Sequence, residues 1–90
     1  MFFFVKVRID INKMEEFGQK IQNGEIKTHP LSTYCLADDP SVGLNIWEAQ
    51  DRKSFDEAFS FHRDFYQEII EISQVILPQS AMKILSQQKR

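Results

Sequence analysis

The chain has 90 residues, of which 42% are hydrophobic and 27% charged, and its formal net charge is −2 at pH 7. This length predicts a single domain over residues 1–90, and the composition is typical of a globular protein. The charge balance gives no electrostatic reason to expect nucleic acid or an anionic membrane as a partner. One cysteine excludes an internal disulfide framework and a CxxC metal site, which favours a reducing, cytoplasmic location.

The first predicted strand covers residues 2–9, where the side chains alternate between two faces. One face is fully apolar and is expected to meet helices: Phe3, Val5, Val7 and Ile9. The other face mixes aromatic and cationic side chains: Phe2, Phe4, Lys6 and Arg8. The two cations interrupt the apolar N-terminus, so the sequence predicts neither a signal peptide nor a membrane span. A helix is predicted next, over residues 10–24.

Two further strands are predicted over residues 33–38 and 42–50, joined by a polar turn that contains Pro40. Alternation does not decide which side of the first of these strands faces the helices. In the second, Leu44 and Ile46 share one face, and we expect them to hold the helices. The other face carries Asn45 and Trp47, which we expect to look away from the helices.

The last third of the chain predicts a helix, a strand and a terminal helix. Residues 51–61 form a helical apolar stripe, and we expect a break near its end, although residues 61–67 would also fit a continuation. Residues 68–77 favour a strand because they are rich in isoleucine and end at Pro78. That proline suits the first turn of a C-terminal helix.

The predicted order β-α-β-β-α-β plus a terminal helix is the ferredoxin-like α+β arrangement, a four-stranded antiparallel sheet with two helices on one face. On the uncovered face, three large aromatic side chains would meet water: Phe2, Phe4 and Trp47. Such exposure forfeits about 1.5–3 kcal/mol for each side chain. We therefore expect a second copy packed sheet to sheet, as a homodimer on which a higher oligomer could build.

Three stretches resemble the dimeric α/β-barrel superfamily. Residues 5–11 (VKVRIDI) resemble the start of muconolactone-isomerase-like proteins. Residues 45–49 (NIWEA), followed by Phe55, Phe59 and His62, are similar to antibiotic-biosynthesis-monooxygenase-type domains. Residues 75–82 (VILPQSAM) resemble the last strand and terminal helix of small uncharacterised members. The resemblance implies a dimeric barrel and leaves the activity open, because members include isomerases, cofactor-free oxygenases and haem-degrading enzymes.

Cofactor and metal chemistry are not expected. Haem-degrading members carry a histidine about ten residues after the tryptophan, whereas the tenth residue after Trp47 is Glu57, and His62 is the fifteenth. His29 and His62 are far apart and have no third ligand nearby in the sequence, so a metal site is not indicated. The chain also lacks the GxGxxG, P-loop, GxSxG and HExxH motifs.

Four residues of the expected inter-sheet face are candidate ligand-binding residues: Lys6, Arg8, Asn45 and Trp47. The two cations suit a carboxylate, or equally a structural ion pair with Glu71. Asn45 needs hydrogen-bond partners if it is buried, and Trp47 fits either a ligand cavity or the dimer interface.

Two residues are candidates for acid–base chemistry. His62 follows the second apolar stripe and could protonate a ligand, or it could simply stabilise the end of a helix. Glu71 would be a general base with a raised pKa if it faces the enclosed space, and an exposed edge residue if it does not.

The first of three functional hypotheses is a protein that binds, isomerises or oxidises a small apolar or aromatic molecule in the inter-sheet cavity without a cofactor. The second is a non-catalytic homo-oligomeric structural or regulatory domain whose sheet face is only an interface. The third, an RNA-binding module that stacks bases on Phe2, Phe4 and Trp47, is disfavoured by the acidic composition and by the lack of an RNP1-like strand.

Overall fold

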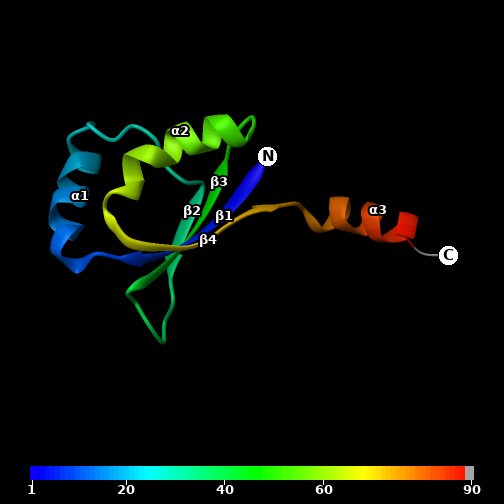
Figure 1. The fold of residues 1–90 in the computed structure, drawn as a ribbon, viewed down its shortest axis with the longest axis horizontal. Coiled ribbons are helices and arrows are strands. Elements are labelled where there is room, and N and C mark those ends of the chain that lie inside the picture. Colours follow the sequence, from blue (N-terminus) through cyan, green and yellow to red (C-terminus); the bar gives the residue numbers. More distant parts are fainter. Residues whose placement is uncertain (89–90) are drawn as a thin grey trace.

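The structure, a computed structural model, describes residues 1–88 as an α+β fold built on one antiparallel sheet (Figure 1). Its elements are β1 (Phe2–Ile9), the 3-10 turn η1 (Ile11–Lys13), α1 (Met14–Gln22), β2 (Ser32–Cys35), β3 (Val42–Glu48), α2 (Arg52–Arg63), β4 (Tyr66–Val75) and α3 (Pro78–Gln88). The strands lie in the order β2-β3-β1-β4. The predicted four-stranded antiparallel sheet is confirmed, and its order is compatible with the ferredoxin-like arrangement.

Helix α2 is longer than the sequence indicated. Asp51 caps its start, because its carboxylate accepts a hydrogen bond of 2.7 Å from the backbone N–H of Ser54. The predicted break near residue 61 is wrong, since the helix continues to Arg63. The reason is that Phe55, Phe59 and His62 are all buried and stand at helical spacing, so the buried stripe extends one turn further.

Helices α1 and α2 lie on the same side of the sheet (Figure 1). We call that side the covered face, and it carries Phe3, Val5, Val7, Thr33, Cys35, Asn45, Trp47, Tyr66, Ile69 and Ile72. We call the other side the open face, and it carries Phe2, Phe4, Lys6, Arg8, Tyr34, Leu44, Ile46, Glu71 and Ser73. The buried core gathers between α2 and the covered face, where the Phe3 and Phe55 rings stack at 4.5 Å. The predicted faces of β1 are therefore confirmed.

The predicted faces of β3 are reversed. Trp47 pairs with Phe3 across the antiparallel ladder and is only 2% exposed, whereas Ile46 pairs with Phe4 on the open face. The Trp47 indole meets the edge of the Phe59 ring at 5.7 Å, so it belongs to the helix-packed core. Alternation tells which residues share a face but not which face is inside, and the larger apolar surface of tryptophan decides it.

The ladder between β1 and β4 contains two register shifts, one after Lys6 and one after Arg8. The first shift places both Ile69 and Ile72 on the covered face, although these residues stand three apart in the sequence. Each shift inserts an unpaired residue, as a β-bulge does. Side chains along β4 therefore do not alternate strictly between the two faces.

Helix α3 projects from the end of β4 as an arm beyond the rest of the domain (Figure 1). None of its residues is buried, and the molecule is 53 Å long against 31 and 17 Å in the other directions. The predicted C-terminal helix is confirmed, but it has no core of its own.

A candidate ligand cavity

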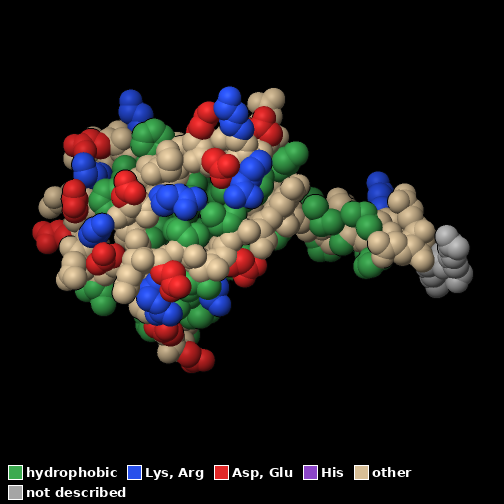
Figure 2. Space-filling model, in the orientation of Figure 1, with side chains coloured by type: hydrophobic (Ala, Val, Ile, Leu, Met, Phe, Trp, Pro, Cys, Tyr) green, Lys and Arg blue, Asp and Glu red, His purple; other side chains and the backbone are tan. Residues whose placement is uncertain are grey.

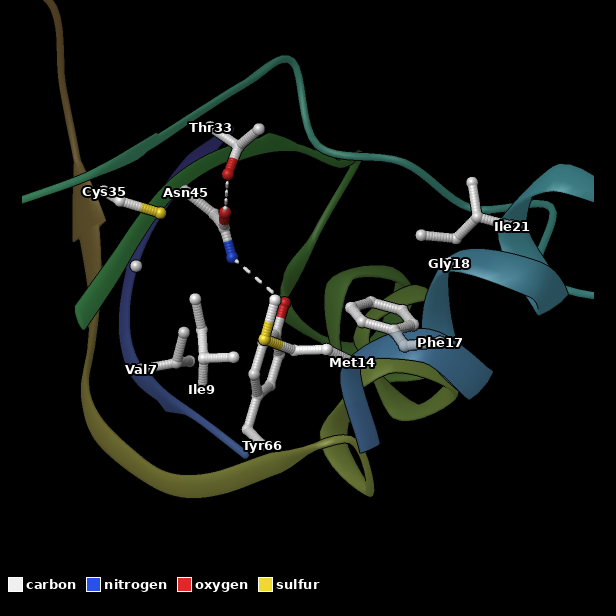
Figure 3. A pocket seen from close by; sticks show the side chains of 11 residues that line it. Val7, Ile9, Met14, Phe17, Gly18, Ile21, Thr33, Cys35, Asn45 and Tyr66 are labelled. Carbon is white, nitrogen blue, oxygen red and sulfur yellow. Dashed lines mark hydrogen bonds between the residues drawn. The ribbon is translucent and has the colours of Figure 1, made fainter. Parts of the chain in front are cut away.

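A cavity of about 260 Å³ lies between α1 and the covered face (Figure 3). Helix α1 supplies an apolar wall of Met14, Phe17 and Ile21, and β1 supplies Val7 and Ile9. Its remaining lining comes from Gly18, Thr33, Cys35, Gly43, Asn45 and Tyr66. A mostly apolar hollow with a few polar groups at one end is the usual form of a small-molecule site.

The polar end of this cavity is a chain of three side chains from three strands (Figure 3). The Thr33 hydroxyl donates to Asn45 Oδ1 at 2.7 Å, and Asn45 Nδ2 donates to the Tyr66 hydroxyl oxygen over a longer 3.5 Å. Asn45 is 4% exposed, so these two neighbours satisfy an amide that would otherwise be costly to bury. The direction of the bonds leaves Tyr66 as an acceptor in this chain.

Tyr66 keeps a hydrogen-bond donor available at the cavity. Its O–H has no acceptor among residues 1–88. Burial raises the pKa of its hydroxyl, and the bond from Asn45 only partly opposes this effect. The hydroxyl is therefore protonated at neutral pH and can donate to a ligand.

A second lobe of about 310 Å³ adjoins the cavity and shares Phe17, Thr33, Asn45 and Tyr66 with it. This lobe adds His29, Pro30 and His62 to the lining. His62 Nε2 lies 2.6 Å from the backbone carbonyl oxygen of Thr28. A carbonyl only accepts, so Nε2 carries the proton and donates.

His62 is held neutral with one ring nitrogen unoccupied. Burial lowers the pKa of its imidazole, and the nearby His29 adds to this, whereas the bond to the Thr28 carbonyl opposes it. In the neutral ring with the proton on Nε2, Nδ1 is a lone-pair acceptor. No residue among 1–88 donates to that nitrogen. His62 therefore has the protonation state of a base.

The sheet separates the residues that the sequence placed in one site. Asn45 lines the cavity and His62 lines its second lobe. Trp47 lies in the core beside them, with its ring 4.9 Å from that of His62, and its Nε1 has no partner among the described residues. The other three candidates, Lys6, Arg8 and Glu71, lie on the open face.

The open-face candidates contact polar groups of their own face. The Arg8 guanidinium lies 3.5 Å from Asp39 and 3.8 Å from Glu68, and it donates to the Ser41 hydroxyl at 3.0 Å. Lys6 stands opposite Glu71 in the ladder. Glu71 is exposed and accepts a hydrogen bond of 2.7 Å from Ser73, so it does not occupy an enclosed position in this chain.

The sequence reasoning missed Tyr66, Thr33 and Phe17. Tyr66 starts β4, two residues before the predicted strand. Thr33 stands directly opposite Asn45 in the hairpin register. Pairing β2 with β3 across the predicted turn would have placed these two side chains together. Cys35 is exposed at the cavity edge.

Among residues 1–88, no group of three or more His, Cys, Asp or Glu side chains is arranged to hold a metal ion. Over the same residues, no helix has both the length and the apolar character needed to cross a membrane. Comparison with known proteins finds no family model, no curated protein and no solved structure that matches the chain. The resemblance to the dimeric α/β-barrel superfamily therefore stays a prediction.

Proposed function

We propose that this chain binds a small apolar or aromatic molecule that carries an acceptor oxygen, and that the ligand lies between α1 and the covered face. The observation that carries the proposal is the Tyr66 hydroxyl, a protonated donor without an acceptor at the polar end of an apolar cavity. A carbonyl or phenolate oxygen would complete its hydrogen bonding. This position replaces the inter-sheet cavity expected from the sequence.

His62 favours cofactor-free proton transfer in the same cavity. Its Nδ1 is an unoccupied base on a ring whose other nitrogen is fixed by Thr28. A base close to a carbon next to a carbonyl can remove a proton, while the Tyr66 hydroxyl stabilises the negative charge that develops on the oxygen. The proton then returns to the same carbon or to its neighbour, which is an exchange or an isomerisation.

Binding is tested with acetophenone and with ethylbenzene, which has a similar shape and no acceptor oxygen. We expect saturable amide shifts around Phe17 and Asn45 in an NMR titration, with acetophenone bound more tightly. Tyr66→Phe should weaken acetophenone about tenfold and leave ethylbenzene unchanged, as expected for loss of one hydrogen bond. Equal affinity for the two probes, or shifts confined to the open face, would contradict the proposal.

Gly18 provides a matched pair of cavity variants. A Cβ at this position meets nothing within 4 Å, so a side chain can be added without a clash. Gly18→Leu should fill part of the cavity and abolish binding. Gly18→Ala should preserve binding and raise the free energy of unfolding by about 1 kcal/mol through helix propensity.

Proton transfer is tested by the exchange of the acetophenone methyl protons in D₂O. We expect the protein to accelerate this exchange, His62→Gln to abolish the acceleration, and Tyr66→Phe to reduce it. If binding occurs and exchange stays at the rate of free acetophenone, the chain is a binding protein and not a catalyst for this class.

We further propose that the fold is ferredoxin-like and that two copies pair through their open faces. The centre of that face is apolar, with Phe4 opposite Ile46 in the ladder and Tyr34 65% exposed beside them. A contiguous apolar patch of this kind favours association. Trp47 is in the core and offers no surface for stacking bases, so the open face is better suited to a protein partner than to RNA.

The pairing is tested by sedimentation equilibrium. Phe4→Glu should convert the dimer to a monomer, whereas Glu68→Gln at the edge of the same face should leave it intact. A wild-type chain that stays monomeric at millimolar concentration would refute the pairing. If the chain dimerises and acetophenone does not bind, the alternative of a structural or regulatory domain is preferred.

A further inference from the structure

The C-terminal arm, which we define as residues 76–88, carries an apolar surface that nothing in the domain covers. Figure 2 shows hydrophobic side chains in the open along it. At 100° per residue, one side of α3 collects its apolar residues, Pro78, Ala81, Met82, Ile84 and Leu85, and Leu77 directly precedes them. Met82 is 65% and Leu85 63% exposed, and no residue of the helix is buried.

The arm does not pack on the sheet of its own chain (Figure 1). Strand β4 ends at Val75 and α3 begins at Pro78, so only residues 76 and 77 connect them. Figure 1 shows the chain running on from β4 into α3, so the arm extends away from the domain. The apolar side of the arm is therefore left uncovered within the chain.

Charge favours a second copy as that partner. Residues 1–75 hold all thirteen acidic residues and eight of the eleven basic ones, a formal charge of −5. The arm, residues 76–88, holds one basic residue, Lys83, and no acidic one, a formal charge of +1, and the two residues that follow it in the sequence are also basic. The arm and the body of a second chain therefore attract each other, and the arm of that second chain finds the same body in return.

We propose that the C-terminal arm crosses to a second copy of this chain and packs there through its apolar side, at the rim of the paired open faces. This inference rests on the proposed homodimer. One twofold association then covers both apolar surfaces that the single chain leaves exposed, the open face and the arm. Reciprocal exchange of terminal segments is a common way to build a dimer.

The test compares single charges placed on the two sides of α3. Leu85→Glu lies on the apolar side, and Gln79→Glu, with the same change in charge, lies on the polar side. By sedimentation equilibrium we expect Leu85→Glu to raise the dimer Kd at least tenfold and Gln79→Glu to change it less than twofold. A chain ending at Val75 should show the same weakening, with an amide spectrum that reports whether its domain stays folded.

A direct readout comes from the Met82 methyl group. Dimers mixed from methionine-methyl-¹³C-labelled and unlabelled chains should show intermolecular NOEs from this methyl. The arm proposal is overturned if Leu85→Glu leaves the Kd unchanged and these NOEs are absent, whether the arm stays in water or binds anionic vesicles. Loss of the dimer in Phe4→Glu with no effect of Leu85→Glu would reject the arm and retain the open-face pairing. The reverse result would reject the pairing of open faces and, with it, the position of the arm at their rim.

Discussion

The two faces of the sheet are built from the same strands but have different chemistry. On the covered face, Phe3, Val5, Val7 and Trp47 are almost fully buried, and one polar residue, Asn45, is enclosed with its hydrogen-bond partners provided. On the open face, aliphatic and aromatic residues alternate with charges such as Lys6 and Arg8, and most of these side chains are only partly buried. Because side chains alternate between the two faces of a strand, a chain of this size can bury a core on one face of the sheet and present a surface suited to association on the other.

The comparison also separates two kinds of polar group. On the covered side, polar side chains are held by hydrogen bonds to particular neighbouring groups, as His62 is by the Thr28 carbonyl. Polar side chains of the open face form exposed ion pairs, as Arg8 does with Asp39. A side chain that is held by one hydrogen bond and keeps another polar atom without a partner suits recognition of a ligand. Exposed charges suit the rim of a protein contact.

The largest expected difference between the faces is in stability, measured by truncating neighbouring residues of β3. Trp47→Ala should lower the free energy of unfolding by about 3–5 kcal/mol, because it empties a site enclosed by Phe55, Phe59 and His62. Ile46→Ala should lower it by about 1–2 kcal/mol, since that side chain is only partly buried. Urea unfolding below the dimer Kd provides the measurement. Equal losses would contradict the assignment of the two faces.

Much of the fold could be predicted from the sequence because its cues are local. The alternation of β1 has one fully apolar side, so only one orientation buries Phe3, Val5 and Val7. In β3 both sides carry large apolar residues. The buried side was hard to identify from the sequence because Trp47 shares that side with the polar Asn45. Which side of β3 is buried depends on the register between β3 and β1, and no local sequence pattern specifies that register.

The candidate site was predicted only in part, for a tertiary reason. Asn45 and His62 were identified by residue type, but their common location depends on how α1 lies over the sheet. The cavity arises between the Phe17 side of α1 and the start of β4, where Tyr66 stands. These two positions are about fifty residues apart in the sequence and are brought together only by the fold.

An intermediate effect is expected from pH, through His62. Burial lowers the pKa of its imidazole below the ordinary 6.5, so the unfolded chain binds the proton more tightly than the folded one. The resulting stability is fully present above pH 6.5 and is lost as the pH falls from there through the folded pKa. Its slope cannot exceed about 1.4 kcal/mol per pH unit for one group.

The slope is isolated by two variants in denaturant titrations between pH 5 and 7.5. His62→Gln should flatten it, because glutamine can keep a donor toward Thr28 without titrating in this range. His29→Gln, which alters an exposed loop histidine, should leave most of the slope in place. If the free energy of unfolding of His62→Gln still falls with decreasing pH at the same slope, the burial of His62 is not the cause of that slope.

The smallest effect is expected for the exposed ion pairs of the open face. Arg8→Gln should change the free energy of unfolding of the monomer by no more than about 0.5 kcal/mol, since Arg8 and its carboxylate partners are screened by water. The pKa of Asp39 should stay below its ordinary 3.8 in this variant, because its main cause is the hydrogen bond from the Ser41 hydroxyl and the guanidinium contributes less. NMR titration of the carboxyl carbon checks this. A large rise in the pKa of Asp39, or a loss of stability above about 1.5 kcal/mol, would mean that Arg8 is held as firmly as the polar groups of the covered face. The two faces would then not differ in how they hold their polar side chains.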